Sequence, residues 1–215
     1  MNIKFNDCKR RMLLLNGVAT LLLCLLIPFN AVGMEFIEAI KDGDGTIEGM
    51  SGAKSVAISP DGNNVYVASE GSDAVAVFSR NITTGALIFM EAQTENINGV
   101  DGMYNPQFVT VSPDNKNVYV VSDGFQLNSG DTSNQAAIAV FRRDINSGKL
   151  IFVEHKKEEM DGIEGLNTPG AVIVSHDEKH VYVVSNGSNI LLFNRNIDTG
   201  ELMFFWEKTI WWKCH

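Results

Sequence analysis

Three Asp-Gly pairs, which we align with one another as equivalent positions along the chain, are the first candidates for chemistry. They are Asp44-Gly45, Asp101-Gly102 and Asp161-Gly162, with Asp42, Glu48 and Glu164 close by. Carboxylates gathered in one place bind hard cations such as Ca²⁺, so Asp44, Asp101 and Asp161 are candidate binding residues for a cation or a basic partner. The alternative is structural, because Asp and Gly also build tight turns. The sequence leaves both interpretations open.

Two histidines four residues apart, His176 and His180, suggest a zinc site. The zinc-peptidase pattern needs a helix and a Glu directly after the first His, but Asp177 stands there. We therefore expect no metal ligation by these residues. The chain also lacks the G-x-S-x-G elbow, the P-loop and the Rossmann glycine pattern. The sequence thus indicates no catalytic residue and no cofactor, with Ca²⁺ as the ion to consider.

The first 33 residues are typical of a secretory signal peptide. The basic residues 9–11 precede an apolar stretch from Met12 to Phe29, and small residues follow at Ala31 and Gly33. The apolar stretch is also long enough to cross a bilayer, so an N-terminal membrane anchor is the alternative. In either case we expect a secreted protein or one of the periplasm or cell envelope.

The rest of the chain is strongly acidic. Residues 1–33 hold four of the 17 basic and one of the 26 acidic residues, which leaves 13 against 25 and a net charge of −12. Such a surface repels phosphate backbones and anionic lipids, which argues against nucleic acids and against membrane contact beyond the signal segment. Small molecules, cations and basic proteins are the better expected partners. Only Cys214 follows the signal, so we expect no internal disulfide.

The elements that must position any site come from one unit repeated three times. Each copy contains a Val-Tyr-Val segment, at 65–67, 118–120 and 181–183, with turn residues around it. Four short runs rich in Val, Ile, Tyr and Phe in each copy predict a four-stranded antiparallel sheet, and apolar second and third strands predict burial on both faces. This all-β pattern is typical of β-propeller blades, which we place at about 52–93, 105–156 and 168–207. Residues 208–215 fit no repeat.

The N-terminal end of the repeat region adds one element. Phe36–Ile40 resembles residues 89–93, so we expect a lone fourth strand before the first blade and, in all, a partial propeller within residues 34–207. Alternating strand directions put the first–second and third–fourth turns at one end of the blades. The longer loops lie at the other end, where we expect a site, because binding residues gather on variable loops held by a rigid scaffold.

The repeats resemble those of the lactonase family of β-propellers, the 6-phosphogluconolactonase-like and YVTN-type proteins. The resemblance rests on Ser59-Pro-Asp-Gly-Asn-Asn-Val-Tyr-Val-Ala-Ser69 and on a hairpin of the form R-[ND]-x-x-[TS]-G-x-L-x-F. It implies closed rings of about seven blades, so three blades suggest either a truncated propeller or one that associates with a second copy to close the ring.

Three functions follow from these observations. The first is an exported propeller that acts as a binding or scaffold module of the cell envelope. The second, implied by the resemblance, is a lactone hydrolase, which needs a general base to activate water and a cation or amide to stabilise the oxyanion. The third is a truncated fragment without a function of its own.

Overall fold

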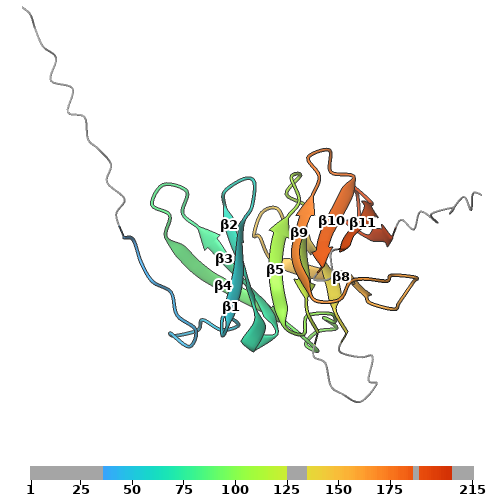
Figure 1. The fold of residues 1–215 in the computed structure, drawn as a ribbon. Coiled ribbons are helices and arrows are strands. Elements are labelled where there is room, and N and C mark those ends of the chain that lie inside the picture. Colours follow the sequence, from blue (N-terminus) through green and yellow to red (C-terminus); the bar gives the residue numbers. More distant parts are fainter. Residues whose placement is uncertain (1–35, 125–134, 186–188, 205–215) are drawn as a thin grey trace, which may run out of the picture. The chain divides into compact units, whose positions relative to one another are not determined.

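The computed structural model describes residues 36–124, 135–185 and 189–204 (Figure 1). The predicted signal peptide and the off-pattern tail at 208–215 lie outside these residues. The chain divides into residues 1–36 and 37–215, and all the strands described below belong to the second unit. Among the described residues, no helix is long and apolar enough to cross a membrane.

Three four-stranded antiparallel sheets make up the described part, each a meander of consecutive strands. The first blade contains β1 (Ala53–Ile58), β2 (Asn64–Ser69), β3 (Ala74–Arg80) and β4 (Leu87–Thr94). The second contains β5 (Pro106–Val111), β6 (Asn117–Ser122), β7 (Ala137–Arg143) and β8 (Leu150–Lys157). The third contains β9 (Pro169–Val174), β10 (His180–Ser185), β11 (Asn189–Arg195) and β12 (Leu202–Phe204). One short 3-10 helix, η1 (Glu70–Ser72), follows β2.

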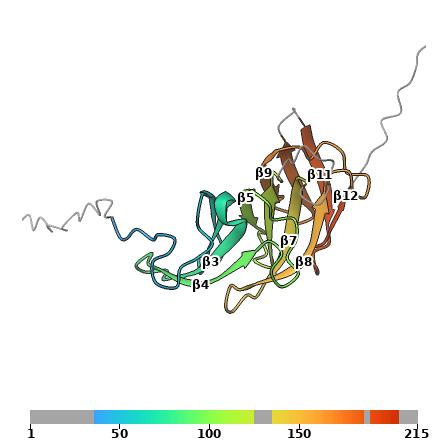
Figure 2. The same cartoon turned by 90° about the horizontal axis from the view of Figure 1, so that it is seen from below.

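The blades pack face to face with their first strands next to one another. β5 contacts β1 on one side and β9 on the other, and the two views show the three sheets in that order (Figures 1 and 2). One apolar cluster joins the first and second blades and another joins the second and third. The middle blade is thus buried on both faces, and the predicted all-β partial propeller is confirmed.

The Ser-Pro-Asp-Gly segment forms the turn between the first two strands. Gly62 N donates to Ser59 O at 2.7 Å, and Gly62 adopts φ 75°, which a glycine reaches without strain. The Ser59 hydroxyl donates to Asp61 Oδ1 at 2.6 Å and accepts from Asn64 N at 3.0 Å. The same bonds recur in the third blade, so the His176–His180 segment is such a turn followed by the start of β10.

In the second and third blades, a buried arginine at the end of the third strand joins the blade to the one before it. Between the first and second blades, Arg143 Nη2 lies 2.8 Å from Asp61 Oδ2 and 2.6 Å from Asn64 Oδ1. Arg143 Nε donates to Tyr66 Oη at 2.8 Å, and that hydroxyl donates to Gly148 O at 2.8 Å. The Arg143 side chain is wholly buried. We call this set of bonds the blade latch.

The latch is repeated between the second and third blades. Arg195 Nη2 lies 2.8 Å from Asp114 Oδ2 and 2.7 Å from Asn117 Oδ1, and Arg195 Nε donates to Tyr119 Oη at 2.8 Å. Tyr119 Oη in turn donates to Gly200 O at 2.9 Å. Burial raises the pKa of Tyr119 to about 12, so this hydroxyl keeps its proton and its donor role at neutral pH. The Asp, Asn and Tyr of the repeated sequence are therefore inter-blade contacts.

The predicted lone strand at Phe36–Ile40 is not a strand in the structure, although it lies where one was expected. Glu38 Oε1 accepts from Leu87 N at 2.7 Å. Glu91 of β4 accepts from Leu150 N in the same way, at 2.8 Å, and Glu154 of β8 accepts from Leu202 N. The segment thus takes the place of an outer strand of a preceding blade. Among the described residues no neighbouring strand pairs with it, and this explains its irregular backbone.

Candidate functional site

The three predicted aspartates do not occupy equivalent positions, which corrects the alignment of the Asp-Gly pairs. In the loop before each blade, an amide donates back to the carbonyl three residues earlier, and these amides belong to Asp44, Ile97 and Met160. Asp44 therefore corresponds to two apolar residues. Asp101 corresponds instead to Glu48 and Glu164, while Asp161 occupies the position of Asn98 and Gly45. The sequence pairing failed because the loops differ in where they place glycine. Whether Asp44, Asp101 and Asp161 bind a ligand stays a prediction.

A different set of carboxylates holds these crossover loops closed. Asp42 Oδ1 accepts from Met50 N at 2.9 Å, and Glu95 Oε2 accepts from Met103 N at 2.6 Å. The third member, Glu158, accepts from Leu166 N at 2.5 Å. Each carboxylate caps amides that the strand ladder leaves unpaired, which is a structural task. Because the capping residues are Asp42, Glu95 and Glu158, this task leaves the role of the three predicted aspartates open.

Asp101 takes part in an ion cluster against the outer strand β8. Its Oδ1 lies 2.7 Å from Lys157 Nζ, and its Oδ2 lies 3.4 Å from His155 Nδ1. Burial lowers the pKa of His155. Burial raises the pKa of the adjacent Glu95 to about 7, and the charge of Asp101 adds to that effect. Because β8 is the outermost strand of its sheet, this cluster lies away from the first strands of the blades.

A second polar cluster lies at the loop end beside the first strands. Lys54 of β1 places its Nζ 2.7 Å from Glu70 Oε2, and Gln107 of β5 donates from Nε2 to the same oxygen at 3.4 Å. Asp123, directly after β6, is close enough for the charge of Glu70 to raise its pKa. We call Lys54, Glu70, Gln107 and Asp123 the inner cluster. Among the described residues, no group of three or more His, Cys, Asp or Glu is arranged to hold a metal ion.

The two carboxylates of the inner cluster have different electrostatic environments. The hydrogen bond from Lys54 lowers the pKa of Glu70. Burial, and secondly the charge of Glu70, raises the pKa of Asp123. Asp123 Oδ1 is buried and has no hydrogen-bond partner within the part of the chain that the structure describes. Paired carboxylates with divergent pKa values and an unsatisfied buried oxygen are features of ligand and active sites.

Sequence reasoning placed a site at this end of the blades but missed the inner cluster. Glu70 and Asp123 hold the same position, each directly after the serine that ends the second strand of its blade. That recurrence was the available signal. Lys54 and Gln107 could not be added from the sequence, since their proximity depends on the packing of β1 against β5.

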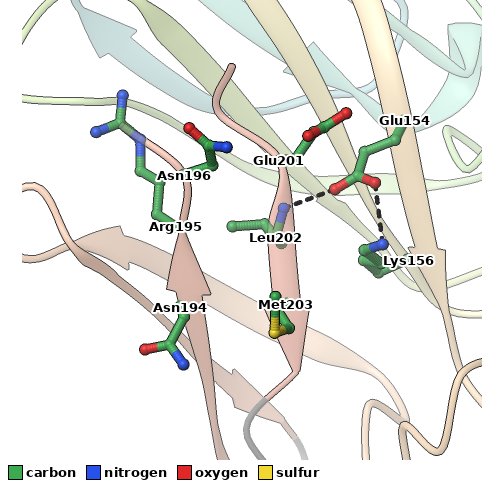
Figure 3. Close-up of a pocket in the computed structure, with 8 residues that line it drawn as sticks. All are labelled: Glu154, Lys156, Asn194, Arg195, Asn196, Glu201, Leu202 and Met203. Atoms are coloured by element: carbon green, nitrogen blue, oxygen red, sulfur yellow. Dashed lines mark hydrogen bonds and ion pairs between the residues drawn. The ribbon is translucent and has the colours of Figure 1, made fainter. Parts of the chain in front are cut away.

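A separate hollow of about 490 Å³ lies on the outer side, between the second and third blades (Figure 3). Its lining includes Glu154, Lys156, Arg195 and Leu202. The Glu154 carboxylate accepts from Leu202 N at 2.7 Å and lies 2.9 Å from Lys156 Nζ. The Arg195 guanidinium points away from Glu154 (Figure 3). Glu154 and Lys156 pair with each other, and Arg195 belongs to the blade latch. We therefore interpret the hollow as a gap between two packed blades and not as a binding site.

Comparison with known proteins agrees with this architecture. The model of the lactonase family, a seven-bladed β-propeller, matches residues 24–97. No curated protein sequence matched the chain. Among solved structures, a protein of Bacteroides uniformis assigned provisionally as a 6-phosphogluconolactonase is 24% identical, with a TM-score of 0.57 over 74% of this chain and 40% of that one.

Two further solved structures give the same result. A provisionally assigned 6-phosphogluconolactonase of Bacteroides fragilis is 22% identical, with a TM-score of 0.56 over 72% of this chain and 38% of that one. The periplasmic gluconolactonase of Pseudomonas aeruginosa is 23% identical, with a TM-score of 0.56 over 73% and 39%. This chain thus spans about two fifths of the length of these proteins, and at these identities they establish the fold. The match of residues 24–97 to the lactonase-family model and the three four-stranded sheets together show that the chain has a β-propeller fold and is similar to that family.

Proposed function

We propose that this protein is an exported binding module that takes up a small polar ligand at the inner cluster. The observation that carries the proposal is Asp123 Oδ1, a buried carboxylate oxygen without a partner among the described residues, beside Glu70, Lys54 and Gln107. A buried polar atom that lacks a partner costs free energy, and a ligand hydroxyl that donates to it offsets that cost.

The composition of the inner cluster favours a polyhydroxylated ligand with a carboxylate or lactone carbonyl. Glu70 and Asp123 accept hydrogen bonds from hydroxyl groups, whereas Lys54 and Gln107 donate to carbonyl or carboxylate oxygens. Sugar acids and their lactones combine these groups. Two of the similar solved structures carry names that refer to 6-phosphogluconolactone hydrolysis and one is named a periplasmic gluconolactonase, which supports the same ligand class.

Export is part of the proposal. The basic and apolar pattern of residues 1–33 and the acidity of the remainder support it, and the name of the Pseudomonas aeruginosa neighbour fits a periplasmic location. An acidic surface also keeps the protein away from anionic lipid headgroups.

Lactone hydrolysis at the same cluster is the second candidate, favoured by the raised pKa of Asp123. In such a reaction, Asp123 takes a proton from water as the water oxygen adds to the lactone carbonyl carbon. Lys54 stabilises the oxyanion, the ring C–O bond breaks, and the proton passes from Asp123 to the leaving alkoxide. The pairing of Lys54 with Glu70 at 2.7 Å favours binding over turnover, because the cation is already engaged.

Calorimetric titration with D-gluconate, and a proton-release assay with glucono-δ-lactone, distinguish the two functions. We expect saturable binding of gluconate that Asp123→Asn and Lys54→Met each weaken about tenfold. Asp161→Asn, at the exposed crossover loop, is the matched control and should bind normally. Hydrolysis above background that Asp123→Asn abolishes would establish the enzyme. No binding and no hydrolysis would reject the inner cluster as a site.

A further inference from the structure

One face of the third blade is exposed among the described residues. In the first and second blades, the equivalent face is buried against the next blade. Tyr66 and Tyr119 are fully buried by the following blade, whereas Tyr182, at the same position, is 37% exposed. Val184 and Ile190 are 50% and 71% exposed, although their counterparts Val121 and Ile138 are fully buried. Asp177 occupies the latch position of Asp61 and Asp114, and it is exposed. We call Asp177, Tyr182, Val184 and Ile190 the trailing face.

The first blade exposes the complementary face. Its residues correspond to those that the third blade packs against the second. Val56 and Ile58 of β1 are 65% and 56% exposed, whereas Val172 and Val174 of β9 are 2% and 7% exposed against the second blade. Arg80 stands where Arg143 and Arg195 stand in their blades, and its Nη1 donates to Gly62 O at 3.0 Å. We call Val56, Ile58 and Arg80 the leading face.

We propose that the trailing face of one protomer binds the leading face of a second copy of this chain, head to tail, through a third blade latch. In that latch, Arg80 of one protomer pairs with Asp177 and Tyr182 of its partner. The charges are complementary, and the apolar residues match those that the two internal junctions bury. Heterologous contacts of this kind close into a ring when the rotation between copies allows it.

Within the latch, His180 departs from the internal pattern. It replaces Asn64 and Asn117, whose amide nitrogens donate to the carbonyls of Ser147 and Thr199 in the following blade. Imidazole has a donor and an acceptor nitrogen, so His180 can still serve both the Arg80 guanidinium and the matching carbonyl of Thr84. The junction between copies is thereby distinct from the internal ones.

The segment Phe36–Ile40 sets a condition on this docking. It lies where the outer strand of a preceding blade belongs, and the partner's third blade already has β12 at that position. β12 pairs with β11 at three positions, whereas Phe36–Ile40 forms no strand, and Phe36 is 80% exposed. We therefore expect Phe36–Ile40 to leave when the second copy binds.

Sedimentation of the purified chain, over roughly a hundredfold range of protein concentration, measures its mass in solution and tests the proposal. We expect a reversible assembly of two or more copies that Arg80→Ala weakens by about tenfold or more, because it removes charged hydrogen bonds. Arg142→Ala, an exposed arginine of β7, is the matched control and should assemble like the parent. Circular dichroism verifies that both variants fold.

Charge exchange gives the sharper result. Arg80→Asp and Asp177→Arg should each disrupt assembly when pure, because each places like charges at every junction. An equimolar mixture should assemble, since the junctions between unlike copies then pair opposite charges. Glu38→Ala, which releases Phe36–Ile40 from Leu87, should strengthen assembly. A single copy at all concentrations would overturn the proposal, as would an assembly that none of these substitutions changes.

Discussion

The two ends of the blades differ in how strictly they repeat. At the turn end, Ser, Asp and Tyr recur at matching positions in all three blades and Asn in two of them, and the latches of Arg143 and Arg195 agree to within about 0.1 Å in their shared distances to Asp, Asn and Tyr. At the loop end, the residues after the second strands and in the crossover loops change from blade to blade. Residues that hold neighbouring blades together therefore vary little, whereas the residues at the end free to recognise a ligand vary more.

Removing a latch arginine should have the largest effect on stability. Arg143→Ala leaves Asp61, Asn64 and Tyr66 without their shared donor in a buried place, so we expect a loss of about 3–5 kcal/mol in the free energy of unfolding. Chemical denaturation measures it. Arg142→Ala, one residue away and exposed, should change stability by about 0.5 kcal/mol at most. Equal losses in the two variants would contradict the latch.

The latch glycines provide the next test. A Cβ at Gly148 would lie 2.0 Å from Asn64 Nδ2, and Gly148 has φ 79°, so Gly148→Ala combines a clash with backbone strain. We expect a loss of about 2–4 kcal/mol in thermal or chemical unfolding. Gly85→Ala is the matched control, since Gly85 has φ 81° but its Cβ would meet only Ile37 Cδ1, at 3.1 Å. It should lose about 1–2 kcal/mol, which is the cost of the left-handed backbone. If Gly148→Ala and Gly85→Ala lost the same stability, the clash with Asn64 would contribute nothing measurable.

Glu95 at the loop end should make stability depend on pH. Its folded pKa of about 7 is above its ordinary value of 4.5, so the folded state binds the proton more tightly. This contribution is present below pH 4.5 and is lost as pH rises toward 7. Glu95→Gln should therefore be more stable than the parent by about 1 kcal/mol at pH 8, with a smaller difference near pH 5. Denaturation at the two pH values measures it. Glu48→Gln, at an exposed acid of another crossover loop, is the control substitution and should change stability by about 0.5 kcal/mol at most.

The smallest effect is expected at the predicted aspartates. Asp101→Asn weakens the contacts with Lys157 and His155 and should cost about 0.5–1 kcal/mol. Asp161 has φ 54°, which Asn tolerates well, so Asp161→Asn should be neutral. Thermal unfolding with and without Ca²⁺ compares them. Stabilisation by Ca²⁺ that either substitution removes would support the calcium interpretation.

The turn end could be predicted from sequence because its signals are local. Pro60 and Gly62 define the first turn, and Gly85 supplies the positive φ of the second hairpin, 81° in the structure. The latch itself was not predicted, since Arg143 and Tyr66 are 77 residues apart and meet only when blades stack. The inner cluster was also not predicted, because Lys54 and Gln107 meet only when the first and second blades pack together. The crossover loops misled the alignment because they place their Asp-Gly pairs at different positions, and only backbone hydrogen bonds reveal which residues correspond.

Amide hydrogen exchange with and without D-gluconate tests most directly whether the variable end recognises the ligand. We predict slower exchange at the amides of Asn105, Asp123 and Gly124, which lie at the loop end beside the inner cluster, and no change at Asn115 and Lys116 in the turn of the same blade. Slower exchange at the turn end, or no change at either end under saturating gluconate, would contradict this assignment.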